Sequence, residues 1–254
     1  MRQLVPVGVW ACLLVVAAQA HTPAQDAARR AESTQTRLRA AEADLAAATH
    51  DIVRAKALMA IGDVLADAQD VSAAKSYYER SLEMVDRLAG SKPEDMDGWR
   101  AKIVVLTRLG DLFDLWDQPM STAYHQQSLE IAERLLRKHP ASQVARREVR
   151  EALTRVGGAA VMSDDPATSI PVLSRAMTMA QSLVDANPGD TGAQNDLFLC
   201  YVHLGFASDN FDDSDGKMTW WRKAVALGEA LERAAALPLE SQGHLAIARS
   251  RLIK

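Results

Sequence analysis

A glycine recurs at a nearly constant interval along the chain. Consecutive copies are 48, 47 and 48 residues apart, at Gly62, Gly110, Gly157 and Gly205. With 13 glycines in 254 residues, three further glycines at preset positions arise by chance about once in ten thousand sequences. A fixed period of this length is the signature of a repeat protein, in which each unit stacks on its neighbours.

Each glycine lies in a stretch whose apolar residues recur every three or four positions. Around Gly62 these are Leu58, Ile61 and Leu65, and similar spacing surrounds the next two copies. Such spacing places the apolar residues on one side of an α-helix. Glycine inside a helix costs about 1 kcal/mol relative to alanine. Its recurrence at one phase therefore predicts that a second helix packs most closely at this point.

A second helical stretch follows each glycine after a short polar break. In the first unit it carries Ala74, Tyr78 and Ser81. Aspartates and serines in the breaks are favourable N-caps, and a proline closes each unit, at Pro93, Pro140, Pro188 and Pro238. The sequence therefore predicts four helix hairpins within residues 49–240, at about 49–96, 97–143, 144–191 and 192–240.

These positions resemble the tetratricopeptide repeat (TPR), in which small and aromatic residues mark where two helices meet. Gly62 corresponds to the small position of the first helix, Ala74 and Tyr78 match the second helix, and Ser81 replaces the usual alanine. The ordinary TPR period is about 34 residues. The excess of about 14 residues is close to four helical turns, so lengthened helices would keep their packing faces in phase. HEAT-type repeats, at about 40 to 47 residues, are the nearest alternative.

Long-period repeats of this kind look like those associated with some bacterial serine/threonine kinases and related signalling proteins. The resemblance implies an all-α, right-handed α-solenoid of about four TPR-like helix-turn-helix repeats with terminal capping helices. Residues 241–254 are expected to form the C-terminal cap, because a fifth glycine would fall near residue 253. Residues 21–48, with Leu38 and Leu45 in helical register, form either a capping helix or a partly frayed lead segment.

Residues 1–20 have the features of a secretory signal peptide. One charge at Arg2 precedes an apolar stretch from Leu4 to Ala18, and the segment ends in Ala18-Gln19-Ala20. We expect cleavage rather than retention as an anchor, and a periplasmic or secreted location. No later apolar run approaches the length of about 20 residues that a membrane helix needs, so no membrane insertion is expected after cleavage. Cys200 then remains alone, which excludes an intrachain disulfide.

Charge and motifs exclude several function classes. The net charge is −4, and the sequence has no lysine- or arginine-rich block. Both features argue against a nucleic-acid partner. The sequence contains no phosphate-binding loop, zinc-protease motif, nucleophile elbow or dinucleotide fingerprint. We therefore expect no catalytic residues, no cofactor and no metal, and hence no enzyme activity. A hydrolase on a helical scaffold is the least favoured alternative.

Some chemically suggestive residues have simpler structural interpretations. His125 occupies the Tyr78 position of its unit, and His203 lies within a first helix, so both are expected to pack or lie on the surface. Trp221 also occupies the Tyr78 position and is expected in the core, with its neighbour Trp220 more open. The acidic segment Asp209–Asp215 departs from the EF-hand pattern and is expected to be a solvated turn, with a weak calcium site as the alternative.

A binding groove follows if the array curves as TPR arrays do, with the first helices on the concave side. Positions three before, one after and four after each glycine would then face the groove. The candidate binding residues are Met59, Asp63, Thr107, Asp111, Asp114, Thr154, Val202 and Phe206. Acidic residues dominate the first half, which predicts an extended or helical peptide with basic and apolar side chains.

The preferred function is therefore an exported, non-catalytic scaffold that binds a protein or peptide partner through its concave groove. The alternative is an accessory or sensor module that docks to a membrane signalling protein. In an alternative interpretation of the groove, Asp63 and Asp111 are simply solvated side chains on a face near a turn and bind no ligand.

Overall fold

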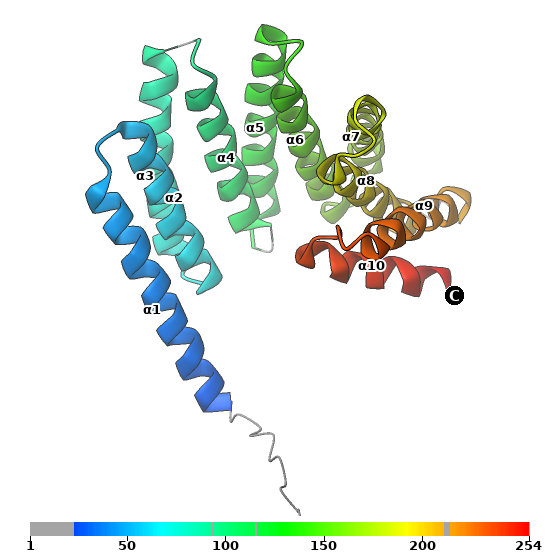
Figure 1. Cartoon of the computed structure of the whole chain (residues 1–254), viewed down its shortest axis with the longest axis horizontal. Helices are drawn as coiled ribbons and strands as arrows, with labels where there is room; N and C mark the ends of the chain where they lie inside the picture. The colour runs from blue at the N-terminus through cyan, green and yellow to red at the C-terminus, as the bar shows by residue number, and fades with distance from the viewer. Residues whose placement is uncertain (1–22, 93, 115, 211–213, 254) are drawn as a thin grey trace, which may run out of the picture.

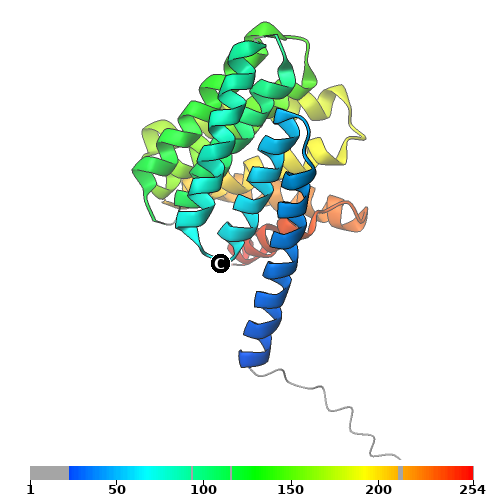
Figure 2. The same cartoon turned by 90° about the vertical axis from the view of Figure 1, so that its left-hand side faces the viewer.

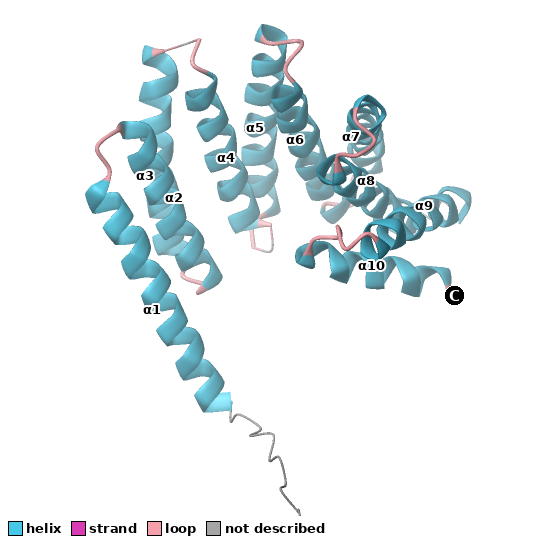
Figure 3. Ribbon diagram, in the orientation of Figure 1, coloured by secondary structure: helices cyan, strands magenta, loops and turns pink. Residues whose placement is uncertain are grey.

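The computed structural model describes residues 23–92, 94–114, 116–210 and 214–253, and these form ten helices joined by short loops (Figures 1 and 3). No strand occurs in the described ranges, which confirms the predicted all-helical class. None of the helices described is long and apolar enough to cross a membrane. The expected leader, residues 1–20, and residues 211–213 of the acidic segment lie outside the described residues.

The helices follow one another as hairpins between two flanking helices. Each hairpin carries one of the recurring glycines in its first helix. The bounds are α1 Pro23–Ala47, α2 Asp51–Asp67, α3 Val71–Ser91, α4 Met96–Phe113, α5 Gln118–Lys138, α6 Gln143–Met162, α7 Pro166–Ala186, α8 Thr191–Asn210, α9 Ser214–Arg233 and α10 Leu239–Leu252.

Consecutive helices pack against each other along the whole array, and the array is curved. The first helices of neighbouring hairpins also touch, α2 with α4, α4 with α6 and α6 with α8, and α8 touches α10. In the described residues the backbones of α3, α5, α7 and α9 do not approach one another. The array is therefore tighter along the first helices, which places them on its inner face, as a helical repeat solenoid requires.

The two ends of the array differ. At the C-terminal end α10 packs against α8 and α9. At the N-terminal end α2 is the one described helix against which α1 packs, and α1 projects beyond the other helices (Figure 2). Most of its described side chains are exposed, and Ala41 is the one that is buried within the helix.

The recurring glycines lie where the two helices of a hairpin come closest. A Cβ atom built on Gly62 would lie 2.5 Å from a ring carbon of Tyr78, and one built on Gly205 would lie 2.7 Å from the Trp221 ring. Gly110 meets His125 in the same way, and Gly157 meets the side chain of Leu173. Real Cβ atoms do not make contacts this short, so the predicted close approach is confirmed in all four hairpins.

The second helices present equivalent side chains to the glycines. Tyr78, His125 and Trp221 are all buried, with exposed fractions of 2%, 1% and 0%. The expected difference between the two adjacent tryptophans is confirmed, because Trp220 is only partly buried and stacks on Tyr201 at a ring-centroid distance of 6.0 Å. The two largest clusters of buried apolar residues each contain one of these aromatic rings, Tyr78 or Trp221.

Longer helices account for the long period. The second helices of the hairpins have 21, 21, 21 and 20 residues, and the first helices have 17, 18, 20 and 20. Aspartates in the breaks cap the second helices as expected: Asp70, Asp117 and Asp165 each accept a hydrogen bond from the backbone N–H three residues on.

Loss of one of these caps gives a testable stability effect. We expect Asp117→Ala to lower the free energy of unfolding by about 1 kcal/mol, because the N–H of Met120 loses its acceptor at the start of α5. Asp117→Asn keeps a side-chain oxygen in the same place and serves as the matched control. Urea unfolding followed by far-UV circular dichroism measures both, and equal losses in the two variants would contradict the capping role.

Candidate functional site

Polar tips of the buried aromatic residues are held by aspartates at the C-terminal ends of the first helices. The hydroxyl of Tyr78 donates to Asp63 over 2.7 Å, and the indole N–H of Trp221 donates to Asp209 over 3.3 Å. His125 Nε2 lies 3.2 Å from Asp114 Oδ1. In the third hairpin Leu173 replaces the aromatic residue, and a leucine needs no such acceptor.

Ion pairs connect the first helices of neighbouring hairpins on the inner face. Arg108 of α4 lies 3.0 Å from Asp63 of α2, and Arg155 of α6 lies 2.6 Å from Asp111 of α4. Both arginines stand two residues before a recurring glycine. These four side chains are 25–41% exposed, so each pair contributes only about 0–1 kcal/mol.

The ladder of ion pairs is interrupted at the fourth hairpin, and at the end of the array Arg251 of α10 lies 3.3 Å from Asp209 of α8. Two residues before the last recurring glycine, the chain has His203 instead of an arginine. Its neighbour on α6 is Gly158, at the position that Asp63 and Asp111 occupy in the earlier hairpins. Burial lowers the pKa of His203 to about 4, with smaller contributions from His244 and Arg155. His203 is therefore neutral at pH 7. The two uninterrupted pairs of the ladder thus lie on α2, α4 and α6, while α8 contributes Asp196 and Asp209 to other ion pairs.

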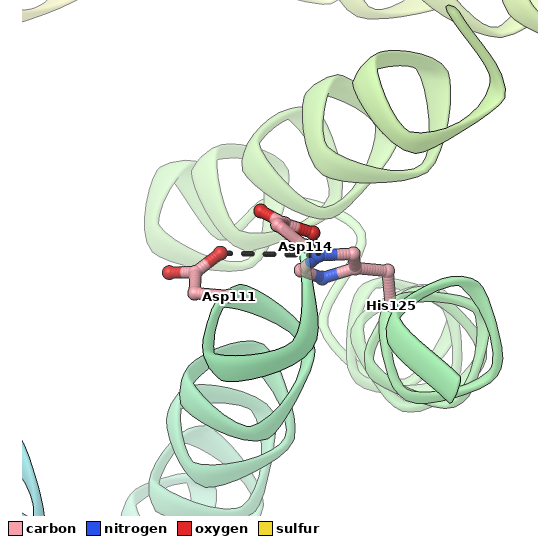
Figure 4. Close-up of side chains that lie close together, drawn as sticks. All are labelled: Asp111, Asp114 and His125. Atoms are coloured by element: carbon pink, nitrogen blue, oxygen red, sulfur yellow. Dashed lines mark hydrogen bonds and ion pairs between the residues drawn. The ribbon is translucent and has the colours of Figure 1, made fainter. Parts of the chain in front are cut away.

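The densest group of polar side chains lies between α4 and α5. Asp111 of α4 and Asp114, the residue just after α4, converge on the ring of His125, which α5 supplies (Figure 4). Burial raises the pKa of Asp111 above its ordinary value, although Arg155 and His125 oppose this. Burial also acts to raise the pKa of Asp114, but hydrogen bonds from His125 and Ser121 outweigh it and hold that pKa below its usual range.

This group lacks the arrangement of a serine nucleophile. Ser121 donates its hydroxyl to Asp114, the same carboxylate that contacts His125. A catalytic serine would instead bond to the imidazole, and Ser121 is fully buried. Cys200 is also fully buried, and burial raises its pKa to about 11, so it is not a reactive thiolate at pH 7.

The eight predicted groove residues divide into two sets. Asp63, Asp111, Asp114 and Phe206 are partly exposed, and the two residues Asp111 and Asp114 are brought together (Figure 4). The four that stand three residues before a glycine are buried, with exposed fractions of at most 8%: Met59, Thr107, Thr154 and Val202. These four side chains pack between helices and are not available to a ligand at the surface.

The side chains of the four buried residues make their contacts inside the protein. Thr107 donates to the carbonyl of Ile103 and lies 3.0 Å from the hydroxyl of Ser128. Thr154 donates to the carbonyl of Arg150, and Val202 belongs to the main core cluster. Of the partly exposed set, Phe206 packs edge-on against Trp221 at 5.1 Å.

Arg108 and Arg155 lie on the inner face but were not among the predicted groove residues. They could have been found from the sequence, because both stand two residues before a recurring glycine and so follow the period of the repeat. The acidic first half of the groove is consequently less negative than the aspartates alone suggest. In the ion pairs of the described residues, Asp63 and Asp111 each have an arginine, whereas Asp114 has His125.

A cavity of about 580 Å³ opens beside this ladder. The first two hairpins and α1 line it, and Arg37 of α1 reaches Asp67 of α2 at 2.7 Å. Its apolar part is formed by Ala66, Val71, Leu112 and Trp116 together with Tyr78. Trp116 is 75% exposed, which is unusual for a large aromatic side chain.

Comparison with known proteins supports the architecture. The solved structure of BtubC (BKLC) from P. vanneervenii is similar, with a TM-score of 0.58 and 13% sequence identity, over 88% of this chain and 90% of BtubC. At this identity the likeness concerns the fold alone. No protein-family model and no curated protein matches the chain.

Proposed function

We propose that this chain is an exported, non-catalytic scaffold of right-handed TPR-like repeats that binds a protein or peptide on its inner face. The leader-like residues 1–20 and the recurring small and aromatic positions support export and the repeat type. The buried Ser121 and Cys200 support a role without covalent catalysis.

One observation carries the binding proposal: a partly exposed carboxylate and an exposed tryptophan stand two residues apart in the chain, just after α4. Asp114 is 40% exposed and lacks an arginine partner in the described ion pairs, and Trp116 is 75% exposed. Large exposed aromatic residues are typical of binding surfaces. The partner that fits is a segment that combines a lysine or arginine with an apolar side chain.

Selection from a displayed peptide library tests this proposal. We expect the immobilised chain to enrich peptides that pair basic with apolar residues, and Asp114→Asn to weaken a selected peptide about fivefold, the equivalent of about 1 kcal/mol. Trp116→Ala should weaken the same peptide further. Calorimetry or a change in tryptophan fluorescence measures the dissociation constant.

A matched control separates the inner face from general charge effects. Asp44 is an exposed carboxylate on α1, and Asp44→Asn changes the net charge as Asp114→Asn does. The control variant should bind as the native chain does. Enrichment of acidic peptides, or equal effects of the two substitutions, would remove the inner face as the binding site.

A further inference from the structure

We propose that Asp111, Asp114 and His125 form a binding site for a divalent transition-metal ion such as Zn²⁺. One ligand atom from each residue lies within 4.8 Å of the other two. His125 Nε2 is 3.2 Å from Asp114 Oδ1 and 3.8 Å from Asp111 Oδ1 (Figure 4). Donor atoms around a tetrahedral Zn²⁺ are about 3.3 Å apart, so small rotations of the side chains suffice.

Packing alone does not require this combination of side chains. Tyr78 fills the equivalent space with a single carboxylate, Asp63, and Trp221 does so with Asp209. The second hairpin instead places an imidazole between two carboxylates. Within the described residues this is the one group of three or more histidine, cysteine, aspartate and glutamate side chains with metal-binding spacing.

The charges around the site favour a cation. Three carboxylates, Asp63, Asp111 and Asp114, face two guanidinium groups, those of Arg108 and Arg155. One negative charge is thus left over. Arg155 contacts Oδ1 of Asp111, the oxygen that also lies 3.8 Å from His125 Nε2, and Arg108 lies 3.9 Å from Oδ2. A carboxylate has about four acceptor positions on its two oxygens, so Asp111 can contact the arginines and a metal together.

The chemistry of the three ligands selects the class of metal. Calcium and magnesium prefer sites made of oxygen ligands, whereas an imidazole nitrogen beside carboxylates suits zinc and its neighbours. His125 is 1% exposed and held in place, while Asp111 and Asp114 are 25% and 40% exposed. An ion, and water as a further ligand, would therefore reach the site from the side of the two partly exposed carboxylates.

Titration of the whole chain with Co²⁺, after purification without a polyhistidine tag, tests the site. We expect a visible Co²⁺ absorption band that saturates at one ion per chain and disappears when Zn²⁺ is added. Zn²⁺ should also raise the unfolding temperature, because it binds the folded state. This test uses no peptide, so its result is independent of the proposed scaffold function.

His125→Tyr is the decisive variant. A tyrosine beside Gly110 copies the pairing of Tyr78 with Gly62 and removes the imidazole ligand. We expect the variant to keep its helix content and to bind Co²⁺ at least about 100-fold more weakly, since even second-layer partners of metal ligands contribute about 10–100-fold. Asp114→Asn should weaken binding as well and serves in its place if His125→Tyr does not fold.

The exposed His50 provides the matched control. His50→Asn also removes one imidazole and should leave Co²⁺ binding unchanged. Arg155→Gln should tighten binding about fivefold, because it removes a cation beside Asp111. No absorption band with the native chain, or a band that survives His125→Tyr at full affinity, would overturn the proposal.

Discussion

Trp221→Ala is expected to lower the free energy of unfolding by about 3–5 kcal/mol, the range for truncation of large buried aromatic residues. Trp221 is fully buried in the main core cluster. Its ring packs on Gly205, and the edge of Phe206 meets it at 5.1 Å. Alanine would leave a cavity in the fourth hairpin and remove the N–H that Asp209 accepts.

Urea unfolding followed by far-UV circular dichroism measures this loss, and Trp116→Ala is the control. Trp116 is 75% exposed, so its replacement should change stability by no more than about 0.5 kcal/mol. A repeat array can unfold from one end. In Trp221→Ala, α8–α10 are therefore also expected to unfold at a lower urea concentration than the other helices. Equal stability of the two variants would contradict the assigned core.

The helix hairpins could be predicted because the recurring glycine marks two things. It shows which side of the first helix is buried, and where along that helix the second helix packs. The step of about 16 residues from each glycine to its facing side chain follows from two helical stretches joined by a short turn. Gly62 meets Tyr78 and Gly205 meets Trp221 through this one relation. The class of fold was therefore readable from spacing alone.

The groove could be predicted only in part, because one residue along a helix turns the side chain by about 100°. The position three before each glycine was expected to face the groove, and Thr107 and Thr154 there are buried. The position two before it carries the partly exposed Arg108 and Arg155. The prediction was therefore wrong by one residue at this position alone, because Asp63 and Asp111, one residue after a glycine, are partly exposed.

The partners of the charged residues could not be predicted, because they lie on different repeats. Arg155 and Asp111 are 44 residues apart in the chain. Their contact depends on how far one hairpin is rotated against the next, which no local pattern records. The same reason hides the group of Asp111, Asp114 and His125, whose members are ordinary helix residues until α5 folds back on α4 (Figure 4).

Gly205→Ala is expected to lower the free energy of unfolding by about 1–3 kcal/mol, the usual cost of overpacking a core, even though alanine favours a helix by about 1 kcal/mol. The new methyl group would lie 2.7 Å from two atoms of the Trp221 ring. That ring is rigid, buried and held at Asp209, so it cannot move aside cheaply. Gly157→Ala should also be destabilising, because the new methyl group would lie 2.5 Å from Cγ of the fully buried Leu173.

Gly243→Ala supplies the opposite control, because it lies within α10 and a Cβ there meets nothing within 4 Å. Helix propensity alone should then stabilise the chain by about 0.5–1 kcal/mol.

A double-mutant cycle gives the strictest test of the glycine's role. In the Trp221→Ala background the space beside Gly205 is empty, so Gly205→Ala should become stabilising through helix propensity. The two substitutions are then non-additive by at least about 1 kcal/mol. Simple additivity would mean that the glycine serves some purpose other than the close approach of the two helices. The sign change would show that one contact, repeated in four hairpins, determines why glycine stands at this period.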